Sequence, residues 1–268
     1  MSKKRILFIT QEMNPYTTIS EISEKVRALA PHVQGGEIEI RVLMPKYGII
    51  NERRHRLHEV VRLSGMNIIV DDDDFPLIIK VASLPGARLQ VYFLDNEEFF
   101  KRKFVFNGKD EKPFDDNQDR MVFFCKGVIE TVKKFGWSPD IVHCNGWFTS
   151  LVPLFLKKVY THDPVFENSK IVFSMFKDEY SQHFTDRFFE IAKINELSDE
   201  DLAPFKDGDK ALLNQGALAY SDAVIKDSDD LSDDDQKAWA DTDKPKLDFF
   251  SDEDYKKESL SFFNELLA

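Results

Sequence analysis

RILFIT (residues 5–10) is an apolar run that leads directly into QEMNPYTTISEISEKV (residues 11–26). An apolar strand near the start of an α/β protein normally enters a glycine-rich turn, where backbone N–H groups at a helix N-terminus bind phosphate. Residues 11–26 contain no glycine. The pattern therefore predicts a strand, a turn and a helix, and it leaves open whether the turn ever bound a phosphate.

Further apolar, β-rich runs alternate with amphipathic stretches along the chain. The predicted strands are 5–10, 37–45, 77–84, 88–95, 140–145, 170–175 and 222–227. The predicted helices are 20–29, 116–135, 148–160 and 209–220. Near-continuous apolar strands that alternate with helices are typical of a parallel sheet covered on both faces. We therefore predict an α/β fold, with a doubly wound, mainly parallel sheet and strand 5–10 at its centre.

One stretch departs from this alternation. Residues 63–95 contain strand runs that follow each other closely, and the acidic run 71–74 lies between two of them. Such spacing indicates antiparallel pairing across a polar turn. We predict an edge hairpin here, with the four aspartates in a solvated turn.

The composition bounds the class of protein. With 42% hydrophobic residues among 268, the chain can bury a sizeable core, and no apolar run reaches the roughly 18 residues of a membrane span. Cys125 and Cys144 are the only cysteines and form no CxxC pair, which favours a reducing cytoplasm over a disulfide scaffold. The net charge of −12 leaves no basic face for nucleic acid. We expect a cytoplasmic protein with neither nucleic acid nor a membrane as partner.

The acidity is concentrated near the C-terminus, where residues 227–268 carry 14 acids and 5 bases. The stretch 227–246 is charged and poor in aliphatic residues, which is typical of a flexible linker. The final residues instead carry an apolar stripe at helical spacing, made of Leu260, Phe262, Phe263, Leu266 and Leu267. We predict a domain over 1–228, followed over 229–268 by an acidic linker and a terminal amphipathic helix that docks on its own domain.

Six segments occur in an order that resembles a known family. They are RILFITQEMNPY (5–16), VLMPKYG (42–48), VYFLDNEEFF (91–100), DNQDRMVFF (116–124), PDIVHCNGWFTSLVPLFLK (139–157) and ALLNQGALAYSDAVI (211–225). Together they resemble the N-terminal domain of the bacterial glycogen and starch synthases. The resemblance covers about residues 4–228. It implies the Rossmann-like N-terminal half of a two-domain GT-B glycosyltransferase that moves glucose from ADP-glucose to an α-1,4-glucan, with the second domain missing.

The resemblance also locates the family's Lys-x-Gly-Gly-Leu motif, whose lysine and glycine amides approach the donor phosphates. Laid on this chain, the lysine falls on Thr18 and the two glycines on Ser20 and Glu21. A cation is thereby lost and a carboxylate gained where a diphosphate would lie. A family histidine that touches the transferred glucose falls on Phe176, whose ring neither donates nor accepts a hydrogen bond. These exchanges argue against ADP-glucose binding, and we assign no catalytic residue.

Four residues remain candidates for contact with a sugar. Glu24 matches a family aspartate on the acceptor side, while His143, Asn145 and Trp147 lie where the family reads His-Cys-His-Asp-Trp-His. From the residues alone, a hydrogen-bonded core histidine and a core tryptophan stay open as alternatives for His143 and Trp147. We expect no cofactor and no metal.

Three hypotheses for function follow. The first is a glycogen/starch synthase-like glycosyltransferase domain, a hexosyltransferase by resemblance, that is inactive as an isolated chain. The second is a non-catalytic module that holds an α-glucan, a maltooligosaccharide or a protein partner in the crevice at the carboxyl ends of the strands. The third is a half-enzyme that a separate polypeptide completes. Whether the chain is an enzyme stays open at the level of sequence.

Overall fold

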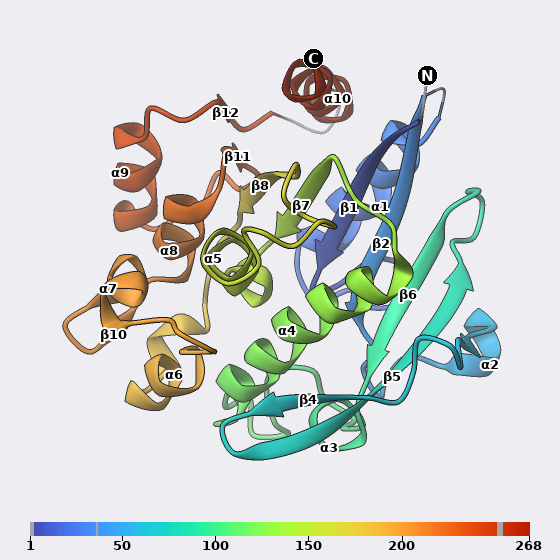
Figure 1. Ribbon diagram of the computed structural model, residues 1–268, viewed down its shortest axis with the longest axis horizontal. Coiled ribbons are helices and arrows are strands. Elements are labelled where there is room, and N and C mark those ends of the chain that lie inside the picture. The colour runs from blue at the N-terminus through green and yellow to red at the C-terminus, as the bar shows by residue number, and fades with distance from the viewer. Residues whose placement is uncertain (1–2, 36, 251–253) are drawn as a thin grey trace.

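The fold is built on one mixed sheet, which a computed structural model describes over residues 3–35, 37–250 and 254–268. The strand order is β12-β11-β8-β7-β1-β2-β6-β5-β3, with β4 paired to β5 (Figure 1). A separate small hairpin pairs β9 with β10. The strands are β1 (Lys4–Thr10), β2 (Ile38–Pro45), β3 (His58–Glu59), β4 (Met66–Val70), β5 (Asp73–Ser83), β6 (Gln90–Asp95), β7 (Ile141–Asn145), β8 (Lys170–Met175), β9 (Lys206–Asp207), β10 (Lys210–Ala211), β11 (Ala223–Lys226) and β12 (Lys246–Leu247).

Strand β1 lies at the centre of the sheet, as predicted. It pairs in parallel with β2 on one side and with β7 on the other, so that Phe8 lies opposite both Val42 and His143. Its four apolar residues 6–9 are completely buried. A strand covered on both faces needs an apolar residue at consecutive positions, and this is why the continuous run RILFIT indicated a central place.

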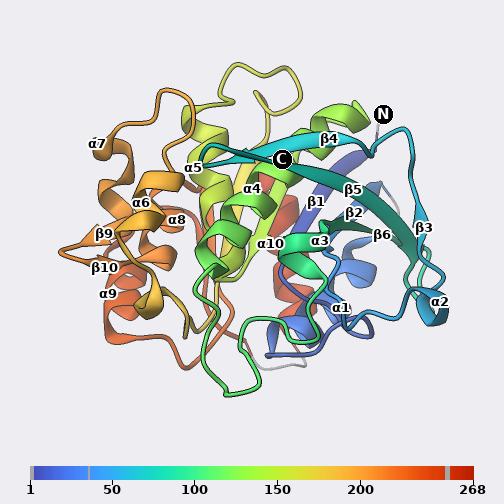
Figure 2. The same ribbon diagram turned by 90° about the horizontal axis from the view of Figure 1, so that it is seen from below.

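Helices cover both faces of the sheet, which confirms the doubly wound fold. Helices α1 and α10 contact each other on one face, while α4, α5 and α8 form a packed row on the other (Figures 1 and 2). The helices are α1 (Ile22–Val33), α2 (Glu52–His55), α3 (Glu97–Phe100), α4 (Asn117–Phe135), α5 (Leu151–Lys158), α6 (Asp186–Ile191), α7 (Asp199–Leu202), α8 (Leu213–Tyr220), α9 (Asp233–Asp241) and α10 (Tyr255–Leu267).

The edge hairpin is also confirmed. Strand β5 runs antiparallel to both β4 and β6. The turn between β4 and β5 is tighter than the acidic run suggested: Asp71 adopts a left-handed conformation with φ of 57°, and Asp73 already begins β5. Aspartate tolerates this conformation better than most residues, because its short side chain bonds locally.

Two predicted boundaries are corrected. The helix expected over 209–220 begins only at Leu213, because residues 206–211 form the hairpin β9–β10 with Gly208 at its left-handed turn. The flexible linker expected after residue 227 instead contains helix α9 and strand β12, which pairs in parallel with β11. The domain boundary at residue 228 stays a prediction, and residues 251–253 lie outside the described residues.

The charges that suggested a linker have structural roles here. The hydroxyl of Ser232 accepts a hydrogen bond from the Asp235 N–H, and three aspartates occupy the first turn of α9, where the helix dipole favours negative charge. The Lys244 ammonium donates to three carbonyls at the end of α8, and Lys246 donates to carbonyls at the end of α9. Charged residues therefore cap the helices in this segment.

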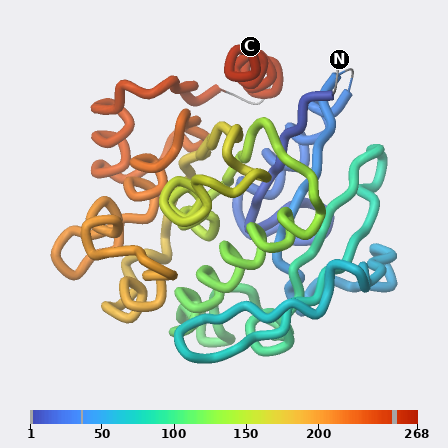
Figure 3. The backbone as a smooth tube through the Cα atoms, viewed as in Figure 1, coloured from blue at the N-terminus to red at the C-terminus, as the bar shows by residue number. Residues whose placement is uncertain are grey.

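The terminal helix docks on its own domain, as predicted. Helix α10, the red end of the tube in Figure 3, packs against α1. The Phe263 ring lies 6.2 Å from Phe8 and 5.2 Å from His143. Phe262 and Phe263 are buried, and the three leucines of the stripe pack against the core. Within the described residues, no helix combines the length and the apolar character needed to cross a bilayer.

Candidate functional site

A crevice of about 360 Å³ lies at the carboxyl ends of β1, β7, β8 and β11. Gln11 follows β1 and Trp147 follows β7, while Phe176–Tyr180 and Ser228–Asp230 extend from β8 and β11. The loop before α1 adds residues 19–22. Because the carboxyl ends of parallel strands meet at one edge, residues distant in sequence converge there, and ligands of open α/β sheets bind at this edge.

The loop between β1 and α1 is closed by its own carboxylate. Glu12 is fully buried, and it accepts hydrogen bonds from the Ile19 N–H at 2.5 Å, from the Ser20 N–H at 3.0 Å and from the Ser20 hydroxyl at 2.5 Å. Burial raises the pKa of Glu12, although these donors oppose the rise. The backbone N–H groups that would face an anionic ligand in a phosphate loop are thus already occupied.

Two of the predicted site residues lie outside the crevice. Thr18 and Glu24 are exposed, and neither lines the cavity. The Glu24 carboxylate accepts a hydrogen bond from the side-chain amide of Asn14. The structure therefore does not bring Glu24 together with Trp147 or Phe176.

His143 and Asn145 lie in the core behind the crevice wall. The His143 ring packs between Phe8 and Phe263, its Nε2 lies 2.7 Å from the Ser174 hydroxyl, and burial lowers its pKa to about 3. The Asn145 amide donates to the Ile9 carbonyl at 3.1 Å and so ties β7 to β1. Both side chains are at most 1% exposed and neither lines the cavity.

Trp147 and Phe176 do line the crevice, together with an aromatic residue that the sequence reasoning missed. The Trp147 ring stacks on Tyr180 with centroids 4.9 Å apart and planes inclined by 27°. Trp147 is 2% exposed, whereas Tyr180 is half-buried and presents the accessible part of the stack. The sequence feature that could have indicated Tyr180 is the position of this aromatic residue a few residues beyond the end of the apolar strand β8.

The crevice carries mostly negative charge. Its lining includes four carboxylates, from Glu21, Glu179, Asp229 and Asp230, and one lysine. The ammonium of Lys177 lies 2.6 Å from Asp230 and 3.5 Å from Glu179, so this cation is already paired. In the described part of the chain, no group of three or more metal-ligating side chains gathers at a point.

A second, polar cavity of about 560 Å³ adjoins the crevice and shares Lys177, Glu179 and Tyr180 with it. Asn214 lies in its wall, where the side-chain amide donates to the Phe176 carbonyl at 3.0 Å and to the Asp235 carboxylate at 2.9 Å. The loop after β8 is therefore anchored to α8 and forms a partition between the two cavities.

Comparison with known proteins identifies the family to which this chain belongs. A family model described as "Starch synthase catalytic domain" matches residues 5–238. The chain belongs to this family. Glycogen synthase of Pelodictyon phaeoclathratiforme (strain DSM 5477 / BU-1) is 39% identical over 175 residues, and that of Chlorobaculum parvum (strain DSM 263 / NCIMB 8327) is 33% identical over 228 residues. These matches cover 64% and 84% of this chain, but only 35% and 46% of the two relatives.

A solved structure of the family shares the fold. The catalytic domain of Starch Synthase IV from Arabidopsis thaliana, bound to ADP and acarbose, matches with a TM-score of 0.71 at 21% identity. The match covers 85% of this chain and 45% of that one. The family suggested by the six sequence segments is therefore confirmed, as is the Rossmann-like N-terminal half. The equivalence of Thr18, Ser20 and Glu21 with the family's lysine and glycines stays a prediction.

Proposed function

We propose that this glycogen/starch synthase-like domain binds an uncharged α-glucan of the maltooligosaccharide type in the crevice, and that it does so without holding ADP-glucose. The observation that carries the proposal is the Trp147–Tyr180 stack beside the four carboxylates that line the crevice at the carboxyl edge of the sheet. A pyranose presents C–H faces to an aromatic ring and hydroxyl donors to carboxylates, so that one site satisfies both.

Charge supports an uncharged ligand. A diphosphate in the crevice would meet four carboxylates and one lysine that is already paired with Asp230. Like charges at short range repel, and the repulsion grows where protein excludes water. The Ile19 and Ser20 N–H groups offer no compensation, because Glu12 already accepts from both.

The size of the site supports an oligosaccharide over a single sugar. The two adjoining cavities, of about 360 and 560 Å³, share Tyr180 and each fall within the range of small-molecule sites. A linear glucan that crosses the partition at Tyr180 would place pyranose units in both.

Calorimetric titration of the purified chain tests the proposal. Maltohexaose should bind, while cellohexaose, its β-linked isomer, and ADP-glucose should give no heat at millimolar concentration. Binding of ADP-glucose, or equal binding of the two hexaoses, would contradict the proposal. Saturable incorporation of radiolabelled glucose into glycogen would assign glucosyl transfer to the chain instead, and a requirement for a second polypeptide would favour the half-enzyme.

A further inference from the structure

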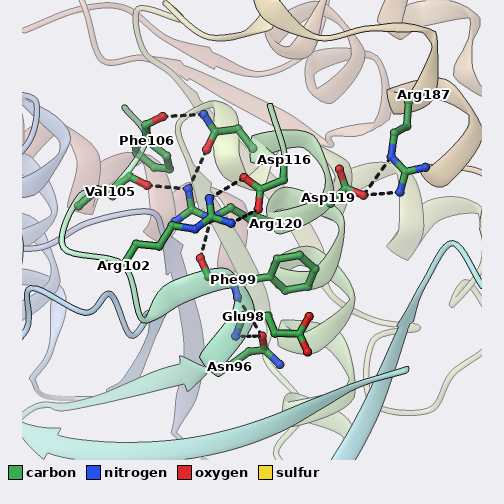
Figure 4. A network of polar contacts seen from close by, with 11 residues as sticks. Asn96, Glu98, Phe99, Arg102, Val105, Phe106, Asp116, Asp119, Arg120 and Arg187 are labelled. Atoms are coloured by element: carbon green, nitrogen blue, oxygen red, sulfur yellow. Dashed lines mark hydrogen bonds and ion pairs between the residues drawn. The ribbon is translucent and has the colours of Figure 1, made fainter. Parts of the chain in front are cut away.

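A buried arginine lies at the centre of a polar network that joins α3, α4 and the segment between them (Figure 4). Arg120, from the first turns of α4, is completely buried. Its guanidinium donates to the Phe99 carbonyl at 2.8 Å, to the Val105 carbonyl at 2.6 Å and to the Asn117 side chain at 2.7 Å. All three acceptors are neutral, and burial lowers the pKa of Arg120 to about 10.

The two backbone carbonyls held by Arg120 belong to opposite ends of one loop. Phe99 lies in α3 and Val105 lies six residues later, so that a single guanidinium fixes residues 99–105 as a unit. The neighbouring Asn117 amide donates to the Phe106 carbonyl at 2.9 Å. A planar guanidinium with several rigidly spaced donors suits this task, whereas a lysine ammonium cannot reproduce the geometry.

Phe106 transmits this constraint to the crevice. Its ring is buried and lies 4.9 Å from Trp147 and 5.1 Å from Tyr180. Trp147 and Tyr180 stack on each other and line the crevice, so Phe106 packs against both members of the stack. Because these rings are closely packed, their neighbours cannot absorb a movement of Phe106, and a displaced Phe106 would shift the rings of Trp147 and Tyr180.

We propose that Arg120 is a positioning residue for the glucan-binding crevice, acting through residues 99–106 on the Trp147–Tyr180 stack. It touches no ligand itself. The inference rests on the proposed function for the consequence on binding, but the order of the stack can be measured without any ligand.

The test compares Arg120→Lys with Arg102→Lys in a parent that carries Trp137→Phe and Trp239→Phe, so that Trp147 is the only tryptophan. Arg102 is the matched control, because both of its hydrogen bonds go to the Asp116 carboxylate and none to the carbonyls of residues 99–106 (Figure 4). Both variants keep the positive charge. Acrylamide quenching of Trp147 reports the stack, calorimetry with maltohexaose reports binding, and far-UV circular dichroism reports folding.

Arg120→Lys should fold, should make Trp147 more accessible to acrylamide, and should weaken maltohexaose binding about tenfold. Arg102→Lys should match the parent in both. Parent-like quenching and affinity in folded Arg120→Lys would overturn the proposal. If the parent binds no maltohexaose, the proposed function fails, and quenching alone decides the role of Arg120. If Arg120→Lys does not fold, Asn117→Ala, which releases the Phe106 carbonyl, is measured under the same criteria.

Discussion

The loops that follow β1 and β8 lie at the same edge of the sheet, but only the loop after β8 contributes aromatic side chains to the crevice. After β1, the buried Glu12 carboxylate accepts hydrogen bonds from the Ile19 and Ser20 N–H groups, so the loop is closed on itself. After β8, Lys177 is exposed, and the half-buried Tyr180 lines both cavities. Both loops pair backbone N–H groups with a carboxylate of their own, since Asp178 accepts hydrogen bonds from the Tyr180 and Ser181 N–H groups. Only the loop after β8 also places an aromatic ring in the wall of both cavities.

This difference shows that the place of a binding site within a fold does not decide which loop binds. In open α/β sheets the carboxyl edge is the usual ligand site, but a loop can contribute only groups that the protein has not already paired. Here two backbone N–H groups after β1 are paired with Glu12, and the aromatic rings that line the crevice come from the segments after β7 and β8. Each prediction below perturbs one of the two loops.

The largest effect is expected from Glu12→Ala in the closed loop. The variant removes the acceptor of two backbone N–H groups and one hydroxyl. A hydrogen bond to a charged group contributes about 1.5–3 kcal/mol to stability. We expect a loss of about 3 kcal/mol in the free energy of unfolding, measured by urea denaturation. Glu24→Ala, at an exposed position in the following helix α1, is the control and should stay within about 0.5 kcal/mol. Equal midpoints for the two variants would show that the loop is not held by Glu12.

In the open loop, Tyr180→Ala should weaken maltohexaose binding about tenfold, equivalent to about 1.4 kcal/mol. The reason is loss of the accessible ring of the Trp147 stack, on which we place a pyranose face. Tyr180→Phe keeps the ring and should bind within about twofold of the wild type if stacking dominates. Calorimetric titration with maltohexaose measures the affinity of both variants. Unaltered binding by Tyr180→Ala would move the ligand away from this stack.

The pH dependence of stability distinguishes the buried carboxylate from the exposed ones. Burial raises the folded-state pKa of Glu12 above its unfolded value, so the folded protein retains the proton to higher pH. The contribution of Glu12 therefore makes stability fall as pH rises through the window between the two values. Glu12→Gln should remove this component when urea midpoints are compared from pH 4 upward. A stability profile parallel to that of the wild type would contradict the assignment.

The smallest effect is expected from Lys177→Ala. The Lys177–Asp230 pair is exposed on both sides, at 49% and 72%, and water screens exposed ion pairs so that they contribute little to stability. The urea midpoint should match that of the wild type, and maltohexaose affinity should change by less than about twofold. A large loss of affinity would mean that the lysine contacts the ligand, and an anionic glycan would then replace the uncharged one as the expected class.

The central strands, the central place of β1 and the edge hairpin were predictable from local pattern alone. Strands such as RILFIT are continuous apolar runs, and a strand that is buried on both faces admits almost nothing else. The stripe on α10 likewise required a buried surface, because a short helix is stable only when its apolar face is covered. By contrast, the charged segment over α9 and β12 resembled a linker, since its lysines and aspartates find their helix ends only in the folded chain.

The site depended on contacts between distant segments. Nothing local to Glu12 indicates that it closes a loop eight residues later, and nothing near His143 indicates that Phe263, 120 positions away, covers its ring. Likewise, Tyr180 and Trp147 form one stacked surface only because the ends of β7 and β8 lie side by side in the sheet. The sequence by itself determined the apolar strands and the amphipathic helices of the core, because burial periodicity is a local property. The tertiary structure alone decided which polar and aromatic groups remain available to a ligand, because availability depends on what every other segment has already paired or covered.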